Sequence, residues 1–182
     1  MTDYFALLDQ PRAPWLDTAA LKEIFRRRTL EEHPDATGNH SANHFADLNE
    51  AYQVLQDPKR RLHHLLSLEN RAPSANQPVP ADLTELFLQI GARNQTATRL
   101  LEKMRAAANP LSKSLLRSDA VVAQKDLERL RHQLRTLRTA AEARLAQTDS
   151  KQFEQLTELY QRFAYLDRWS AQLDELAFQL SL

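Results

Sequence analysis

Apolar residues near the N-terminus come in short groups separated by polar stretches. Residues 4–8 form an apolar patch that ends before Pro11. Residues 18–32 are predicted to form a helix, because Asp17 or Thr18 can cap its first turn. The apolar stripe of this helix is narrow, with Leu21, Ile24 and Phe25.

Two more helices and a linker follow. The segment "HPDATGNH" is predicted to be a loop, because it contains Pro34 and Gly38. Helical spacing then recurs at Phe45, Leu48, Tyr52 and Leu55, and another helix begins at Pro58. The proline-rich run "ENRAPSANQPVPAD" is typical of a linker. The chain is therefore divided into residues 1–69, a linker at 70–80 and a second domain at 81–182.

The second domain has longer apolar patterns. Asp82 and Glu85 resemble a capping box for a helix that runs to about Ala108, and "NPLSKSLLRSDAV" is predicted to be a loop or broken turn. Two heptad-like seams follow, at Leu127, Leu130, Leu134, Leu137 and Ala141, and at Leu156, Leu159, Phe163, Leu166, Ser170, Leu173, Ala177 and Leu180. These patterns predict an antiparallel three-helix bundle in an all-α protein. A long intermolecular coiled coil is the alternative.

Composition narrows the classes of function. The 24 basic and 24 acidic residues give no net charge, so binding to nucleic acid over the whole surface is not expected. Cysteine is absent, and with only two glycines no phosphate-binding loop is expected. No secretory signal or membrane-length apolar run is present, which predicts a soluble, cytoplasmic protein. No arrangement of nucleophile and base indicates an enzyme, and neither a cofactor nor a metal site is predicted.

The segment "FRRRTLEEHPDATG" is a candidate binding surface. Proline restricts the residue before it, so His33 is held extended at the end of a helix and Asp35 projects from a loop. Lys22 and Arg26 are four residues apart on the preceding helix and share one face. This combination is suited to docking to an acidic partner that carries an arginine. A simple solvated helix face is the alternative.

Residues 3–68 resemble a J-domain. The order of motifs is "DYFALL", a basic helix, "HPD" and "NEAYQVLQDPKRR". The resemblance implies binding to a DnaK/HscA-type chaperone and stimulation of its ATPase. It assigns this contact to His33, Pro34 and Asp35, supported by Lys22, Arg26 and Arg27. The sequence departs from the J-domain pattern at Arg28, Glu32 and Ala36.

Nearly the full length of the chain resembles, unevenly, the HscB or Jac-type iron–sulfur cluster assembly co-chaperones. This resemblance includes "HHLLSLEN" and the late helix "LYQRFAYLDRWSAQLDEL". It implies delivery of an IscU-type iron–sulfur scaffold, bound through Leu86, Phe87, Ile90 and Tyr165. Gly91 and Asn94 stand where the scaffold-binding motif has acidic residues.

The residues themselves add a reason for a client site. Tyr165 lies off the seam of its helix. In the helix that follows the linker, Leu83, Leu86 and Ile90 suffice to form the buried stripe, so Phe87 and Leu88 are not needed for the core. An exposed apolar patch is a binding candidate, although packing beneath another part of the chain is the alternative. We therefore predict a monomeric co-chaperone. Its rivals are a J-domain protein with another client and a structural helical protein with a degenerate J-domain.

Overall fold

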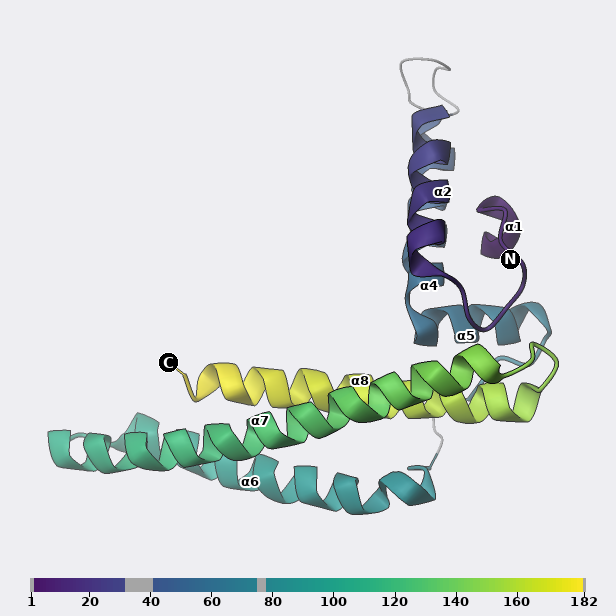
Figure 1. The fold of residues 1–182 in the computed structure, drawn as a ribbon. Coiled ribbons are helices and arrows are strands. Elements are labelled where there is room, and N and C mark those ends of the chain that lie inside the picture. Colours follow the sequence, from purple (N-terminus) through teal and green to yellow (C-terminus); the bar gives the residue numbers. More distant parts are fainter. Residues whose placement is uncertain (1, 32–40, 75–77, 182) are drawn as a thin grey trace. The chain divides into compact units, whose positions relative to one another are not determined.

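The protein is described by a computed structural model, which covers residues 2–31, 41–74 and 78–181 (Figure 1). All regular secondary structure in these ranges is helical, which confirms the predicted all-α class. The elements are α1 (Tyr4–Leu7), α2 (Thr18–Glu31), α4 (Ser41–Gln56), α5 (Pro58–Leu68), the short 3-10 helix η2 (Ala81–Leu83), α6 (Thr84–Ala106), α7 (Pro110–Gln147) and α8 (Phe153–Gln179). Within the described ranges, none of these helices has both the length and the apolar character that spanning a bilayer requires.

The chain forms two compact units, and each unit is built from two separate segments of the sequence. The first unit contains residues 1–76 and 141–163, and the second contains residues 77–140 and 164–182. Both long helices, α7 and α8, therefore contribute residues to each unit. The division predicted at residues 70–80 stays a prediction, and the grouping of 141–163 with the N-terminal helices was not part of it.

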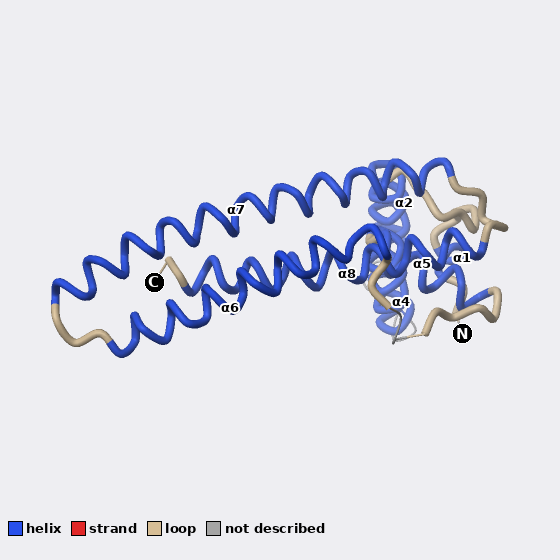
Figure 2. Tube along the Cα trace, turned by 90° about the horizontal axis from the view of Figure 1, so that it is seen from below, coloured by secondary structure: helices blue, strands red, loops and turns tan. Residues whose placement is uncertain are grey.

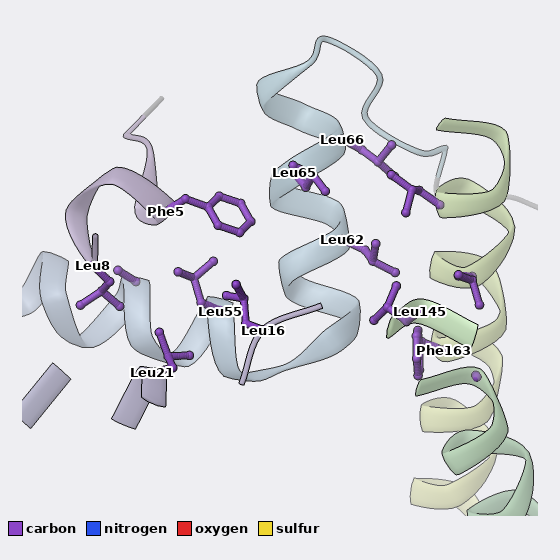
Figure 3. Close-up of a cluster of buried hydrophobic side chains, with 14 of the residues drawn as sticks. Phe5, Leu8, Leu16, Leu21, Leu55, Leu62, Leu65, Leu66, Leu145 and Phe163 are labelled. Atoms are coloured by element: carbon purple, nitrogen blue, oxygen red, sulfur yellow. The ribbon is translucent and has the colours of Figure 1, made fainter. Parts of the chain in front are cut away.

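The first unit is built around α4, which packs against α1, α2 and α5. Its core includes Phe5, Leu21, Leu48, Leu55, Leu62, Leu66, Leu145, Leu159 and Phe163. In Figure 3, Leu62 of α5 points toward Leu145 of α7 and Phe163 of α8. A short N-terminal region therefore completes its core with residues far away in the sequence.

Short polar side chains define where these helices begin. Asp17 accepts a hydrogen bond from the backbone N–H of Ala19 at 2.8 Å, so it caps α2 as predicted. Asp57 does the same for Arg60 at 2.7 Å, directly before Pro58. A proline in the first turn loses no hydrogen bond, because that N–H has no partner inside the helix. Both boundaries therefore follow from local chemistry.

The second unit is a three-helix bundle of α6 with parts of α7 and α8. Figures 1 and 2 show α7 running antiparallel to α6 and α8. Its core contains Leu127, Leu130 and Leu134 of the first predicted seam and Leu166, Leu173 and Leu180 of the second. The other buried seam residues, Ala141, Leu156, Leu159 and Phe163, belong to the core of the first unit. Trp169, one position from Ser170 of the second seam, is also buried here. The predicted bundle is thus present in this unit.

The predicted loop at residues 109–121 is wrong, because α7 begins at Pro110. The Asn109 side chain accepts a hydrogen bond from the Ser112 N–H at 2.7 Å, and Pro110 occupies the first turn. Ala120 is buried in the core of the bundle, with Leu116 packed against it. The "NP" pair therefore starts a helix instead of breaking one.

Arg61 of α5 is a buried cation in the first unit. Only 2% of it is exposed, and its guanidinium donates to the carbonyl oxygens of Pro14 at 2.8 Å and Leu55 at 2.5 Å. Burial lowers the pKa of Arg61 to about 10, against the attraction of Asp57 and Glu142. Arg61 thus stays charged at neutral pH and ties the loop before α2 to the end of α4.

Candidate functional site

The outer face of α2 is positively charged. Lys22, Arg26 and Arg27 are all exposed. Among the described residues, Arg26 pairs only with Glu23, one turn earlier, at 3.5 Å, and such an exposed pair is weak. Lys22 and Arg27 make no ion pair with any described residue. All three cations are therefore accessible to a partner.

The opposite side of α2 holds the helix in place. Leu21 is fully buried, and the ring of Phe25 stacks on Tyr52 of α4 with centroids 4.4 Å apart. Arg28 pairs with Asp9, just after α1, at 2.5 Å. Arg28 stands where the J-domain pattern has a packing leucine, so here the contact is ionic. These contacts orient the helix so that its cations face outward.

The segment with His33, Pro34 and Asp35 lies outside the described residues, as do Glu32 and Ala36. The described part of α2 ends at Glu31, directly before it. Arg26 and Arg27 are in the last two turns of the described part of α2. The charged face therefore leads along the chain into this segment.

The second set of predicted site residues divides into buried and accessible positions. Leu86 and Ile90 belong to the core of the bundle, whereas Phe87 is 45% exposed. Tyr165 is half-buried and packs against the same core. A partner at this surface would therefore meet Phe87 and Tyr165, while Leu86 and Ile90 hold α6 in position.

Trp169 connects these two aromatic residues and was missed as a site residue. Its ring lies 6.2 Å from that of Phe87 and 5.4 Å from that of Tyr165. The guanidinium of Arg168 lies 5.4 Å from the Tyr165 ring, within the range of a cation–π contact. The spacing of four residues between Tyr165 and Trp169 was the available signal, because such residues are neighbours on a helix.

Gly91 lies beside this aromatic cluster on an open surface. A Cβ atom built at Gly91 would meet no atom within 4 Å. A larger side chain would therefore fit without rearrangement, and the packing of α6 does not demand a glycine here. Within the described ranges, no group of three potential ligands could hold a metal ion.

Comparison with known families identifies the N-terminal region. Residues 3–64 match the family model of the DnaJ domain. The chaperone protein DnaJ of Caulobacter vibrioides is 43% identical over 63 residues, which cover 34% of this chain and 16% of that protein. The co-chaperone protein HscB homologue of Shewanella baltica is 33% identical over 115 residues, covering 59% of this chain and 63% of that protein. The chain thus spans less than two thirds of the length of these curated relatives.

Solved structures extend the likeness over nearly the full chain. The chaperone HscB from Vibrio cholerae matches with a TM-score of 0.56 and 22% identity, covering 98% of this chain and 99% of that one. Human co-chaperone HscB matches with a TM-score of 0.52 and 20% identity, covering 96% and 82%. The chain therefore contains a DnaJ domain at residues 3–64 and has an HscB-like fold, as predicted. These relatives are named as chaperones and co-chaperones, in agreement with the prediction that the chain is not an enzyme.

Proposed function

We propose that this protein is an HscB-type co-chaperone that binds a DnaK/HscA-type chaperone and stimulates its ATPase. One observation carries the proposal: a DnaJ domain at residues 3–64 presents an exposed cationic helix that leads into His33-Pro34-Asp35. Lys22, Arg26 and Arg27 would attract an acidic surface of the chaperone. Asp35, an acceptor, would pair with an arginine there, which is the strongest type of side-chain hydrogen bond.

The test is single-turnover ATP hydrolysis by a purified chaperone of this class with and without the full-length protein. His33→Gln and Asp35→Asn should abolish the stimulation while circular dichroism stays unchanged. Lys22→Glu should weaken the stimulation through a slower association rate, because exposed charges act mainly on encounter. Arg105→Glu is the matched control, since Arg105 is exposed on α6 of the second unit. Full stimulation by the His33 and Asp35 variants would overturn the docking role.

We further propose that the second unit presents a client, an IscU-type iron–sulfur scaffold, at the cluster of Phe87, Tyr165 and Trp169. An exposed phenylalanine and a half-buried tyrosine beside a buried tryptophan are suited to a transient interface. Phe87→Ala and Tyr165→Ala should each weaken scaffold binding, measured by calorimetry, without changing the basal stimulation of the chaperone. Gly91 and Asn94 favour a second candidate, a J-domain protein with a different client. Unchanged scaffold binding in both variants would select that candidate.

A further inference from the structure

A groove between α6 and α7 in the second unit has no role in the proposed function. It encloses about 390 Å³. Arg93, Arg99 and Lys103 line it from α6, and Asp119, Val122 and Asp126 line it from α7. Leu100 and Ala123 add apolar lining. The groove therefore combines an apolar interior with charged walls.

The groove lies on the other flank of α6 from the aromatic cluster. At about 100° per residue, Thr96, which also lines the groove, lies opposite Phe87 around the helix axis. Arg93, Arg99 and Lys103 lie within about 60° of Thr96. Phe87 contacts Trp169 of α8, whereas the groove residues of α6 face α7. A ligand in the groove would therefore leave the proposed client surface free.

Two cations of the groove have no partner among the described residues. Arg93 pairs with Asp126 at 3.2 Å, and Asp126 also pairs with Arg129 at 2.8 Å. Arg99 and Lys103 make no hydrogen bond or ion pair within the described part of the chain. Asp119 is the other carboxylate of the lining, so the groove carries a net positive charge. This charge is local, since the whole chain is neutral.

An exposed apolar stripe continues the groove along α7. Leu111, Leu115 and Val122 are 72%, 63% and 61% exposed. Their spacings of four and seven residues place them within about 40° of one another around the helix axis. Asp119 and Asp126 lie on the same side of α7. The stripe extends about 16 Å along the helix, which is three turns of a partner helix.

We propose that this groove and stripe bind an acidic amphipathic helix of a partner protein. Its apolar side would cover Leu111, Leu115 and Val122, and its carboxylates would pair with Arg99 and Lys103. The cations favour an acidic partner over a neutral one. The proposal is independent of the J-domain and of the aromatic cluster.

Two matched synthetic peptides test it. Each has about 18 residues, with leucines at spacings of four and seven, and its flanking positions are all Glu in one peptide and all Lys in the other. Titrated to about 1 mM into the full-length ¹⁵N-labelled protein, a range that detects weak complexes, the Glu peptide should shift amide signals of residues 96–103 and 115–126. The double variant Arg99→Glu with Lys103→Glu should bind the Glu peptide about tenfold more weakly. It loses two exposed ion pairs with the peptide and replaces each attraction by a repulsion.

Further variants separate the charges from the apolar stripe. Asp119→Asn should tighten binding of the Glu peptide, Leu115→Ser should weaken it, and Phe87→Ala should leave it unchanged. Circular dichroism checks that each variant is folded. If the Lys peptide binds as tightly as the Glu peptide, the stripe binds apolar helices without regard to their charge, and the proposal is overturned. It is also overturned by absent shifts, or by a dimer in sedimentation that Leu115→Ser abolishes, which would assign the stripe to a second copy.

Discussion

Arg61 and its neighbour Arg60 offer a direct comparison of a buried and an exposed arginine. Arg61→Met keeps most of the side-chain volume but removes the donors to the carbonyls of Pro14 and Leu55. The Leu55 carbonyl is near the C-terminus of α4, where helix carbonyls lack partners within the helix. Both oxygens would remain buried without a hydrogen bond.

The magnitude follows from these two contacts. Each buried carbonyl left without a partner costs about 1–3 kcal/mol, so the two together cost about 2–6 kcal/mol. Methionine also removes the cost of burying a charge, which places the expected loss of stability at the lower end, about 2–4 kcal/mol. Arg60 makes an ion pair with Glu50 at 2.7 Å between half-exposed side chains. Arg60→Met should therefore cost only about 0–1 kcal/mol.

Equilibrium urea unfolding, followed by far-UV circular dichroism, measures both variants. Because α7 and α8 contribute to both units, global unfolding does not show which unit loses stability. Hydrogen exchange of the α5 amides, which belong to the first unit alone, then shows whether the loss is located there. A clear difference between the two variants supports the tethering role of Arg61. If both unfold within about 0.5 kcal/mol of wild type, the two buried hydrogen bonds do not stabilise the fold.

Three further predictions follow from particular contacts. His64 is buried, and its Nε2 accepts a hydrogen bond from the backbone N–H of Tyr4 at 3.1 Å. Burial lowers the pKa of His64 below 6.5 despite Asp3, so its contribution to stability is complete above pH 6.5 and is lost as the pH falls below that value. Thermal unfolding of His64→Gln should therefore depend less on pH than that of wild type; an equal dependence would contradict this role. Ile90→Ala should destabilise the protein by about 2–5 kcal/mol, because Ile90 is buried, and Phe87→Ala should destabilise it by clearly less, because Phe87 is exposed. Equal losses of stability in urea unfolding would contradict this prediction. Association with the chaperone should slow as salt rises, because exposed charges are screened over about 8 Å near physiological salt, and a salt-independent rate in stopped flow would exclude steering by α2.

Local signals in the sequence were sufficient for most helices and for the charged face. Asp17 and Pro58 mark helix starts where the structure has them, because capping depends on residues only a few positions apart. The leucine seams predicted which faces of α7 and α8 are buried. Lys22, Arg26 and Arg27 are exposed, as a helix with a narrow apolar stripe requires. Their role, with that of His33, Pro34 and Asp35, stays a prediction.

Other features depend on residues that meet only in the folded chain. The segment at 109–121 has the composition of a loop, yet it is helical, and its Ala120 belongs to the buried core of the bundle. Nothing near Arg61 in the sequence indicates that it reaches Pro14, and nothing near Leu145 indicates that it joins the N-terminal core.

The sequence by itself thus determined the helices and their amphipathic faces, since these depend on propensity, caps and spacing along a few turns. The tertiary structure alone decided that Phe87, which the core stripe of its helix leaves out, is not covered by another part of the described chain, and that the ring of Trp169 lies near those of both Phe87 and Tyr165. The physical reason is that an apolar stripe shows which side of a helix avoids water. Only the neighbouring helices determine how far around the axis that side is covered.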